Sequence, residues 1–188
     1  DSLDVDVVEV DITAAAHTAT RHLVENGHRR IAFLSSLELH STPYQRGDVL
    51  DVSSVAGRVD GITQALEEAG VDHPESFFRF GAQQGAKARA ITRELLTGEE
   101  QPTAIIASDS LIAMSVLAEL RDLKLRVPDD VSFVMFDDFE WTTLISPPVS
   151  VISQPVYEVG VAAAKQLITR IEGRASGAKT QRFPAEFI

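Results

Sequence analysis

Two adjacent acids follow one of the most apolar runs of the chain. Residues 131–136 read VSFVMF, and Asp137 and Asp138 come directly after them. Such a near-continuous apolar run is typical of a strand that is covered on both faces in a parallel sheet. Small ligands bind outside the carboxyl ends of the strands in open α/β sheets, so the two acids are candidate ligand contacts. The alternative interpretation is that both acids only cap a solvent-exposed loop.

A basic residue and a short hydroxyl are further candidates. We expect Arg58 in the first turn of a helix that begins at Ser53 or Ser54, where the helix dipole disfavours a cation. An anionic or hydroxyl-rich partner would offset that cost, and the alternative is an exposed arginine that faces a nearby acid. Ser108 and Asp109 follow another expected strand and begin the next helix, where either can serve as N-cap.

These side chains must be positioned by alternating strands and helices. The expected strands cover residues 5–10, 30–35, 76–80, 103–107, 131–136, 149–153 and 182–188. The expected helices cover residues 14–26, 53–70, 86–96, 110–123 and 156–172, with Thr13 as the first N-cap. This alternation predicts an α/β fold with a doubly wound, mostly parallel sheet. A long loop over residues 37–52 is expected to be functional or mobile.

A parallel sheet places the carboxyl ends of its strands at one edge. The loops that follow residues 34, 80, 107 and 136 should therefore open on the same crevice. The side chains that we expect there are Arg58, Gln83, Ser108, Asp109, Asp137 and Asp138. Donors, a hydroxyl and carboxylates that converge in this way suit a polar or polyhydroxylated small molecule.

Composition excludes several classes of protein. The chain has 188 residues, of which 44% are hydrophobic, which is enough for one core or for two small lobes. The formal net charge of −11 argues that this segment does not hold a nucleic-acid backbone by itself. The absence of cysteine excludes disulfides and thiolate metal sites, and it fits a cytoplasmic protein. We expect no membrane span and no signal peptide from the sequence pattern.

An enzyme receives little support from the motifs. The GAQQGA run at residues 81–86 lacks the G-x-G-x-x-G spacing of a dinucleotide site, and no phosphate loop or nucleophile elbow is present. The five histidines show no ligand spacing. We therefore expect no catalytic residue, no cofactor and no metal, although Asp137 and Asp138 leave a Mg²⁺ site or a general base open as an alternative.

Four segments together resemble the LacI/GalR family of bacterial transcription regulators. VPDDVSFVMFDD and PPVSVISQP in residues 127–155 resemble two signatures of that family, with Met135 where glycine is usual. HLVENGHRRIAFLS from His22, RVDGITQALEEAG from Arg58 and PTAIIASDSLIAMSVL from Pro102 resemble three more stretches. Their collinear order over nearly the whole chain makes the resemblance specific. It implies the effector-sensing domain of such a regulator, with a periplasmic-binding-protein-like type I fold that is mainly the C-terminal lobe.

The resemblance also assigns roles to individual positions. Arg58, Asp137 and Gln154 match residues that contact effector hydroxyls or carboxylates in the family. Ser108 stands where the family usually has asparagine, and Gln83 stands where sugar-sensing members often have a stacking aromatic residue. The loss of that aromatic platform puts a standard hexose in doubt. Asp138 is then expected to order the loop rather than to bind ligand.

The family pattern implies a division of the chain into lobes. Residues 1–11 would be a remnant of the N-terminal sensor lobe, and residues 12–153 the C-terminal effector-binding lobe. Residues 154–173 would form a helix that belongs with the N-terminal lobe, and residues 174–188 a return strand of the C-terminal lobe. The apolar face of that helix should be left uncovered by this chain, for a preceding segment or a partner chain to cover.

The implied partners are a small sugar-like effector, a second copy of the chain in a homodimer, and operator DNA held only through a domain outside this sequence. No membrane partner is implied. An alternative function with the same architecture is a solute-binding protein of a transport system, because architecture alone does not fix function.

Overall fold

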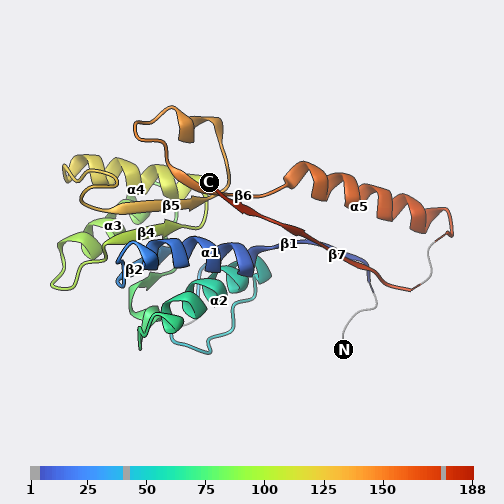
Figure 1. Ribbon diagram of the computed structural model, residues 1–188, viewed down its shortest axis with the longest axis horizontal. Coiled ribbons are helices and arrows are strands. Elements are labelled where there is room, and N and C mark those ends of the chain that lie inside the picture. Colours follow the sequence, from blue (N-terminus) through green and yellow to red (C-terminus); the bar gives the residue numbers. More distant parts are fainter. Residues whose placement is uncertain (1–4, 40–42, 175–176) are drawn as a thin grey trace.

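The computed structural model describes residues 5–39, 43–174 and 177–188 (Figure 1). Residues 1–4 and positions 40–42 of the long loop lie outside the described residues. None of the helices in the described ranges is both long and apolar enough to cross a membrane.

A six-stranded sheet forms the centre of the molecule, with the strand order β3-β2-β4-β5-β6-β8. All neighbouring strands are parallel except β8, which runs antiparallel to β6. The strands are β2 (Ile31–Leu34), β3 (Phe78–Arg79), β4 (Ala104–Ala107), β5 (Ser132–Phe136), β6 (Ser150–Ser153) and β8 (Glu186–Phe187). The prediction of a mostly parallel α/β sheet is confirmed. In β2 and β4 every residue is buried, as expected of strands with both faces covered.

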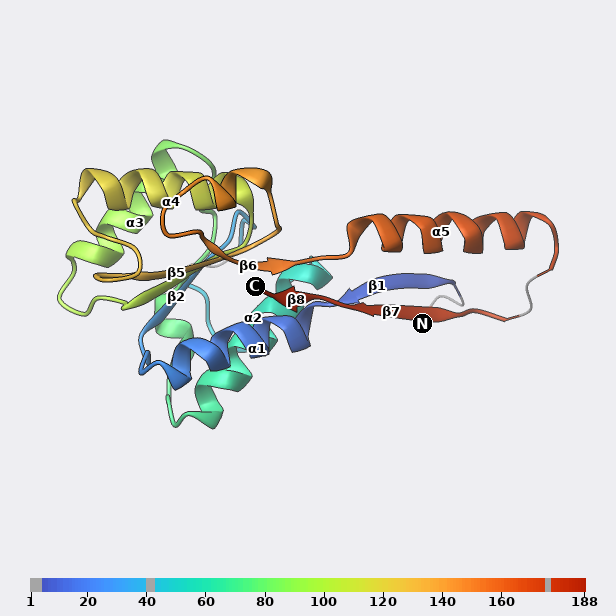
Figure 2. The same ribbon diagram turned by 45° about the horizontal axis from the view of Figure 1, so that its top comes forward.

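Two helical layers cover the sheet, one on each face (Figure 2). Helices α1 (Ile12–Glu25) and α2 (Ser53–Glu68) lie on one face, and α3 (Ala86–Thr97) and α4 (Ser110–Asp122) lie on the other. Each layer encloses its own apolar core because side chains alternate between the faces of a strand. Phe33 and Val134 point into the core beneath α1 and α2, whereas Leu34 and Met135 point into the other.

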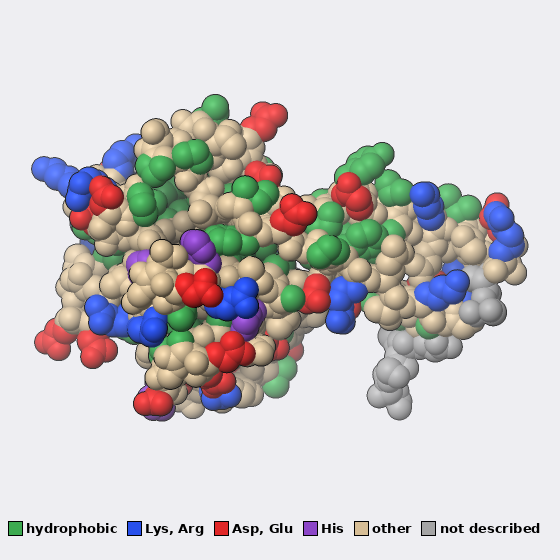
Figure 3. Space-filling view, viewed as in Figure 1, with side chains coloured by type: hydrophobic (Ala, Val, Ile, Leu, Met, Phe, Trp, Pro, Cys, Tyr) green, Lys and Arg blue, Asp and Glu red, His purple; other side chains and the backbone are tan. Residues whose placement is uncertain are grey.

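A second, smaller unit extends away from this body. Strand β1 (Val7–Asp11) pairs in parallel with β7 (Thr180–Pro184), and α5 (Val156–Ile171) packs against β1 (Figures 1 and 2). No residue of α5 is buried. Its exposed apolar side chains are Val156, Tyr157, Leu167, Ile168 and Ile171, and Figure 3 shows hydrophobic side chains over this part of the molecule. The prediction of an uncovered apolar face on this helix is confirmed.

Several element boundaries differ from the predictions. Helix α1 begins at Ile12, because Asp11 rather than Thr13 is the N-cap and accepts a bond from Ala14 N over 3.2 Å. The expected strand over 76–80 is reduced to β3, because Pro74 starts a 3-10 helix (η1, Pro74–Phe77). The expected strand over 182–188 is divided: β7 joins β1 outside the main sheet, and only β8 enters it. A short 3-10 helix, η2 (Glu140–Thr143), follows β5.

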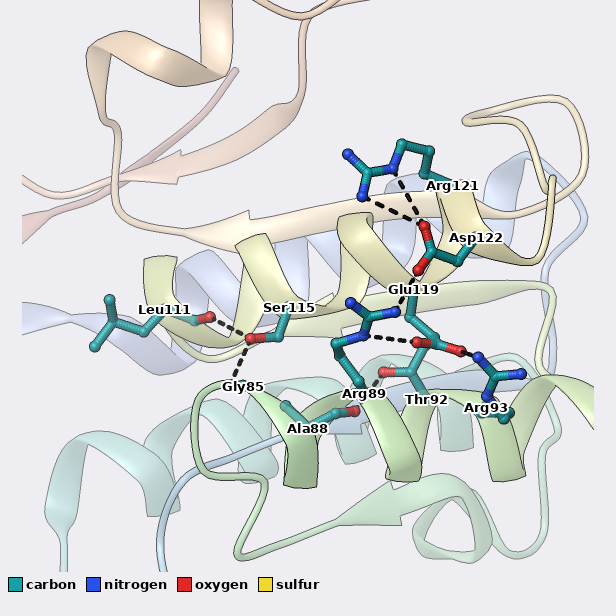
Figure 4. Close-up of polar contacts among 10 residues, drawn as sticks. All are labelled: Gly85, Ala88, Arg89, Thr92, Arg93, Leu111, Ser115, Glu119, Arg121 and Asp122. Carbon is teal, nitrogen blue, oxygen red and sulfur yellow. Dashed lines mark hydrogen bonds and ion pairs between the residues drawn. The ribbon is translucent and has the colours of Figure 1, made fainter.

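An ion-pair network joins α3 to α4 on the outer face of the body (Figure 4). Glu119 is 1% exposed, and its carboxylate lies between Arg89 Nε at 2.9 Å and Arg93 Nη2 at 2.5 Å. Arg89 also reaches Asp122. Beside the network, Ser115 donates to Leu111 O and accepts from Gly85 N, which fixes the start of α3 against α4.

Candidate functional site

The carboxyl ends of β2, β4 and β5 lie at one edge of the main sheet, as the sequence predicts. Asp137 follows β5 directly and has a φ of +76°, in the left-handed region that non-glycine residues rarely occupy. Its backbone N donates to Ile152 O over 3.1 Å, and its Oδ1 accepts from Gln154 Nε2 over 2.6 Å. The strained turn thus directs the Asp137 carboxylate toward the residue that leads from β6 into α5.

Arg58 lies in the second turn of α2, whereas its predicted position was the first turn. Its Cζ lies 4.4 Å from the centroid of the Phe136 ring, a cation–π contact. Its Nε is buried and has no hydrogen-bond partner among the described residues. Burial lowers the pKa of Arg58, and the charges of Asp137 and Asp109 partly offset that effect. A guanidinium in this environment favours any ligand that brings a hydrogen-bond acceptor.

Ser108 and Asp109 occupy the end of β4. Ser108 is 2% exposed, and its Oγ donates to Asp109 Oδ2 over 3.0 Å. Asp109 Oδ1 accepts from the backbone N of Leu111 and of Ile112, each over 3.0 Å, and so caps α4. Asp109 is therefore the cap, and Ser108 is the buried hydroxyl beneath it.

Gln83 lies in a different group. Its side chain is exposed, and its Nε2 donates to Glu38 Oε1 over 2.8 Å. The same oxygen accepts from Lys87 Nζ over 2.9 Å. These three residues form a polar cluster near the ends of β2 and β3, and among the described residues no hydrogen bond or ion pair joins this cluster to Arg58 or Asp137.

Gln154 connects the polar edge to a cavity. The cavity has a volume of about 760 Å³ and lies between the starts of α1 and α2 and the β1–β7 pair. Ser53, Ser54 and Gly57 from the first turns of α2 line it together with Gln154. A ligand that occupies this space would touch the main body, the smaller unit and the residue that links them.

Phe136 was not among the residues that the sequence predicts at the crevice, whereas Asp109 was. Phe136 was interpreted as a core residue, and its contact with the Arg58 guanidinium depends on tertiary packing that no local pattern encodes. Asp109 was treated as a capping residue near the crevice; its position before an apolar helical run was the available signal. Asp138 is exposed, and among the described residues its one hydrogen-bond donor is Ser153 Oγ, over 3.5 Å, which fits the expected loop-ordering role.

The chemistry available here is recognition through charge and hydrogen bonds. The edge offers a guanidinium, two carboxylates, an amide and a hydroxyl, from Arg58, Asp109, Asp137, Gln154 and Ser108. Within the part of the chain that the structure describes, no three acids, histidines or cysteines lie close enough to hold a metal ion.

Comparison with known proteins decides the family. A family model described as "Periplasmic binding protein-like domain" matches residues 20–188. The chain is 38% identical over 180 residues to a protein of Rhizobium rhizogenes named "Probable opine utilization operon repressor". The aligned segment is 95% of this chain and 88% of that protein. The transcriptional repressor PurR of Aliivibrio salmonicida is 28% identical, over 93% of this chain and 49% of its own length. The chain belongs to the LacI family.

Solved structures of LacI-type regulators share the fold. The structure titled "transcriptional regulator CelR-cellobiose complex" matches with a TM-score of 0.81 and 28% identity, over 98% of this chain and 53% of that chain. The LacI-family chain described here thus spans about half the length of PurR and of CelR, and most of the opine operon repressor. The family resemblance inferred from four collinear motifs is confirmed.

Proposed function

We propose that the chain is the effector-sensing domain of a LacI-type DNA-binding transcriptional regulator. A small polar ligand would bind at the carboxyl edge of the main sheet, on Arg58, Ser108, Asp137 and Gln154, with Gln83 at the margin. Membership of a family of repressors supports this role over catalysis or transport. The observation that carries the site is the partly buried Arg58, which rests on Phe136 and is acted on by the charges of Asp137 and Asp109. Its Nε has no acceptor among the described residues.

The domain boundaries support a mechanism of lobe movement. We assign residues 12–153 to the C-terminal effector-binding lobe and residues 1–11 and 154–173 to the N-terminal lobe, with residues 174–188 returning toward the C-terminal one. Gln154 is the first residue after β6, and only Pro155 separates it from α5. A ligand that changes the Gln154–Asp137 bond would therefore bias the orientation of α5 relative to the main sheet. Differential affinity for two such orientations is all that allosteric control requires.

Operator DNA would be bound by a domain outside this sequence. The net charge of −11 makes direct contact between this domain and a phosphate backbone unfavourable. We expect the complete regulator to act as a homodimer, so that paired DNA-binding domains read two half-sites. The CelR–cellobiose complex supports a sugar as one class of effector, and the probable opine utilization operon repressor supports an opine as another.

Titration calorimetry on the complete protein tests the site. Its effector should first be found by a thermal-shift screen of sugars, sugar phosphates and small acids, because a ligand that binds only the folded state raises the melting temperature. Arg58→Ala and Asp137→Asn should each weaken binding of that compound about tenfold or more. Asp138→Asn is the matched control and should bind like the wild type.

Unchanged affinity in both site variants would refute the site assignment. The regulatory role is tested separately with operator DNA. In an electrophoretic mobility assay the compound should change operator affinity in the wild type and not in Arg58→Ala. A protein that binds the compound but shows no operator affinity in any state would point instead to solute transport.

A further inference from the structure

The charges at the crevice indicate which class of effector it takes, if the proposed sensing function holds. Among the described residues, no carboxylate oxygen lies within 4.0 Å of the Arg58 guanidinium, and its Nε has no hydrogen-bond partner. The contact that the guanidinium makes is with the ring of Phe136. A neutral hydroxyl can accept a hydrogen bond from a guanidinium but brings no negative charge to it. An oxyanion on the ligand would do both, and with a guanidinium it can form two parallel charge-assisted hydrogen bonds.

The neighbouring acids are arranged differently. Both oxygens of Asp109 are occupied, by Ser108 and by the backbone at the start of α4. Asp137 uses only Oδ1, for Gln154, and no donor among the described residues reaches its Oδ2. Asp137 directly follows Phe136, on whose ring Arg58 rests, and its charge acts on the Arg58 guanidinium more strongly than that of Asp109.

The balance of charge limits the ligand further. One guanidinium faces two carboxylates, those of Asp109 and Asp137, so the local formal charge is negative. A ligand with only anionic groups would therefore be repelled by one carboxylate while it pairs with Arg58. A ligand that also carries a cationic amine matches both signs. The polar cluster of Glu38, Gln83 and Lys87 adds a further pair of opposite charges near the same sheet edge.

We infer that the effector is an amino-acid-type zwitterion, with a carboxylate on Arg58 and its ammonium group on Asp137. This inference rests on the proposed sensing function and specifies its ligand. The two halves of the recognition site are the Arg58 guanidinium over the Phe136 ring and the Oδ2 of Asp137, which no described residue reaches with a donor. Free amino acids and N-carboxyalkyl amino acids share this chemistry.

A thermal-shift panel on the complete protein distinguishes the ligand classes. The probes are the twenty amino acids, their N-(1-carboxyethyl) derivatives, the methyl esters of both sets, and neutral sugars that include ribose and cellobiose. We expect at least one zwitterion to raise the melting temperature, and its ester, which keeps the amine but loses the anion, not to do so. Calorimetry with that compound should then show affinity about tenfold to a hundredfold weaker in Arg58→Met and in Asp137→Asn.

The controls separate failure of the inference from failure of the function. Asp138→Asn should keep wild-type affinity, and each variant should show the wild-type circular dichroism spectrum before ligand is added. A neutral sugar that binds in an Arg58-dependent manner, with no zwitterion binding, would overturn the inference and leave the sensing function in place. A zwitterion that binds equally well to Arg58→Met would overturn it as well. If no probe binds and operator affinity responds to none of them, the inference falls together with the proposed function.

Discussion

Gln154 Nε2 donates to Asp137 Oδ1 over 2.6 Å, although the two residues are 17 positions apart in the chain. The bond spans the carboxyl edge of the main sheet, from the end of β5 to the residue between β6 and α5. It is the side-chain link between the proposed ligand site and the helix that extends from the body. The contact therefore joins the proposed ligand site to the residue from which the chain enters α5.

Loss of this contact should be measurable without a ligand. Gln154→Leu keeps a similar side-chain size and removes the donor, so we expect the free energy of unfolding to fall by about 1 kcal/mol. Gln84→Leu is the matched control, because Gln84 is exposed and should tolerate the change within about 0.5 kcal/mol. Urea denaturation followed by circular dichroism measures both values. Equal stability of the two variants would contradict a structural role for the bond.

The smaller unit should show an acid-dependent stability that comes from Asp6. Arg170 donates to both Asp6 oxygens, over 2.6 and 2.7 Å, and Lys179 N adds a bond over 2.8 Å. These bonds, the Arg170 one above all, hold the pKa of Asp6 well below its ordinary value of 3.8. A lowered folded-state pKa contributes stability above the unfolded-state pKa, and this stability is lost as the pH falls toward the folded-state pKa.

Asp6→Asn should therefore lower the melting temperature most above about pH 5, with a difference from the wild type that shrinks as the pH falls below about 4. Melting curves between pH 3 and pH 7, followed by circular dichroism at 222 nm, measure this difference. Asp72→Asn changes an exposed acid and should show a small, pH-independent effect. A difference for Asp6→Asn that is constant across this range would refute the linkage.

Sequence patterns predicted the sheet edge better than the contacts on it. The apolar run before Asp137 and the capping position of Asp109 are local signals, so the strand ends and one cap could be predicted. The contact of Arg58 with Phe136 and the bond of Gln154 to Asp137 join distant segments, and no residue spacing encodes them. The position of the Gln83 side chain could not be predicted, because it donates to Glu38 in the long loop and the path of that loop has no periodic sequence signal.

Glu119 should be a major determinant of the α3–α4 layer, because its buried carboxylate is paired with Arg89 and Arg93, which lie nearer to solvent. Glu119→Ala leaves a cavity and removes both ion pairs, so we expect the free energy of unfolding to fall by about 3 kcal/mol. Glu119→Met fills most of the same volume without a charge and should cost about 1 kcal/mol or less. Glu94→Ala, at an exposed position of α3, should stay within about 0.5 kcal/mol of the wild type.

Denaturant unfolding of the three variants measures how far each substitution lowers the free energy of unfolding. If Glu119→Met is as unstable as Glu119→Ala, the ion pairs themselves stabilise the layer more than the packed volume does. A loss below about 1 kcal/mol in Glu119→Ala would contradict the assignment of Glu119 as a packing and pairing centre.

Two helical glycines should respond in opposite directions to the same substitution. A Cβ on Gly61 would lie 2.8 Å from Ala16 Cβ and 2.8 Å from His17 N, so Gly61→Ala forces α1 and α2 apart. We expect a loss of about 2–3 kcal/mol, because overpacking of a close helix contact strains the backbone. A Cβ on Gly160 in α5 meets nothing within 4 Å, and Gly160→Ala should stabilise its helix by about 0.5–1 kcal/mol. Thermal melts at 222 nm compare both variants with the wild type, and a stability loss in Gly160→Ala similar to that of Gly61→Ala would show that close packing does not explain the cost.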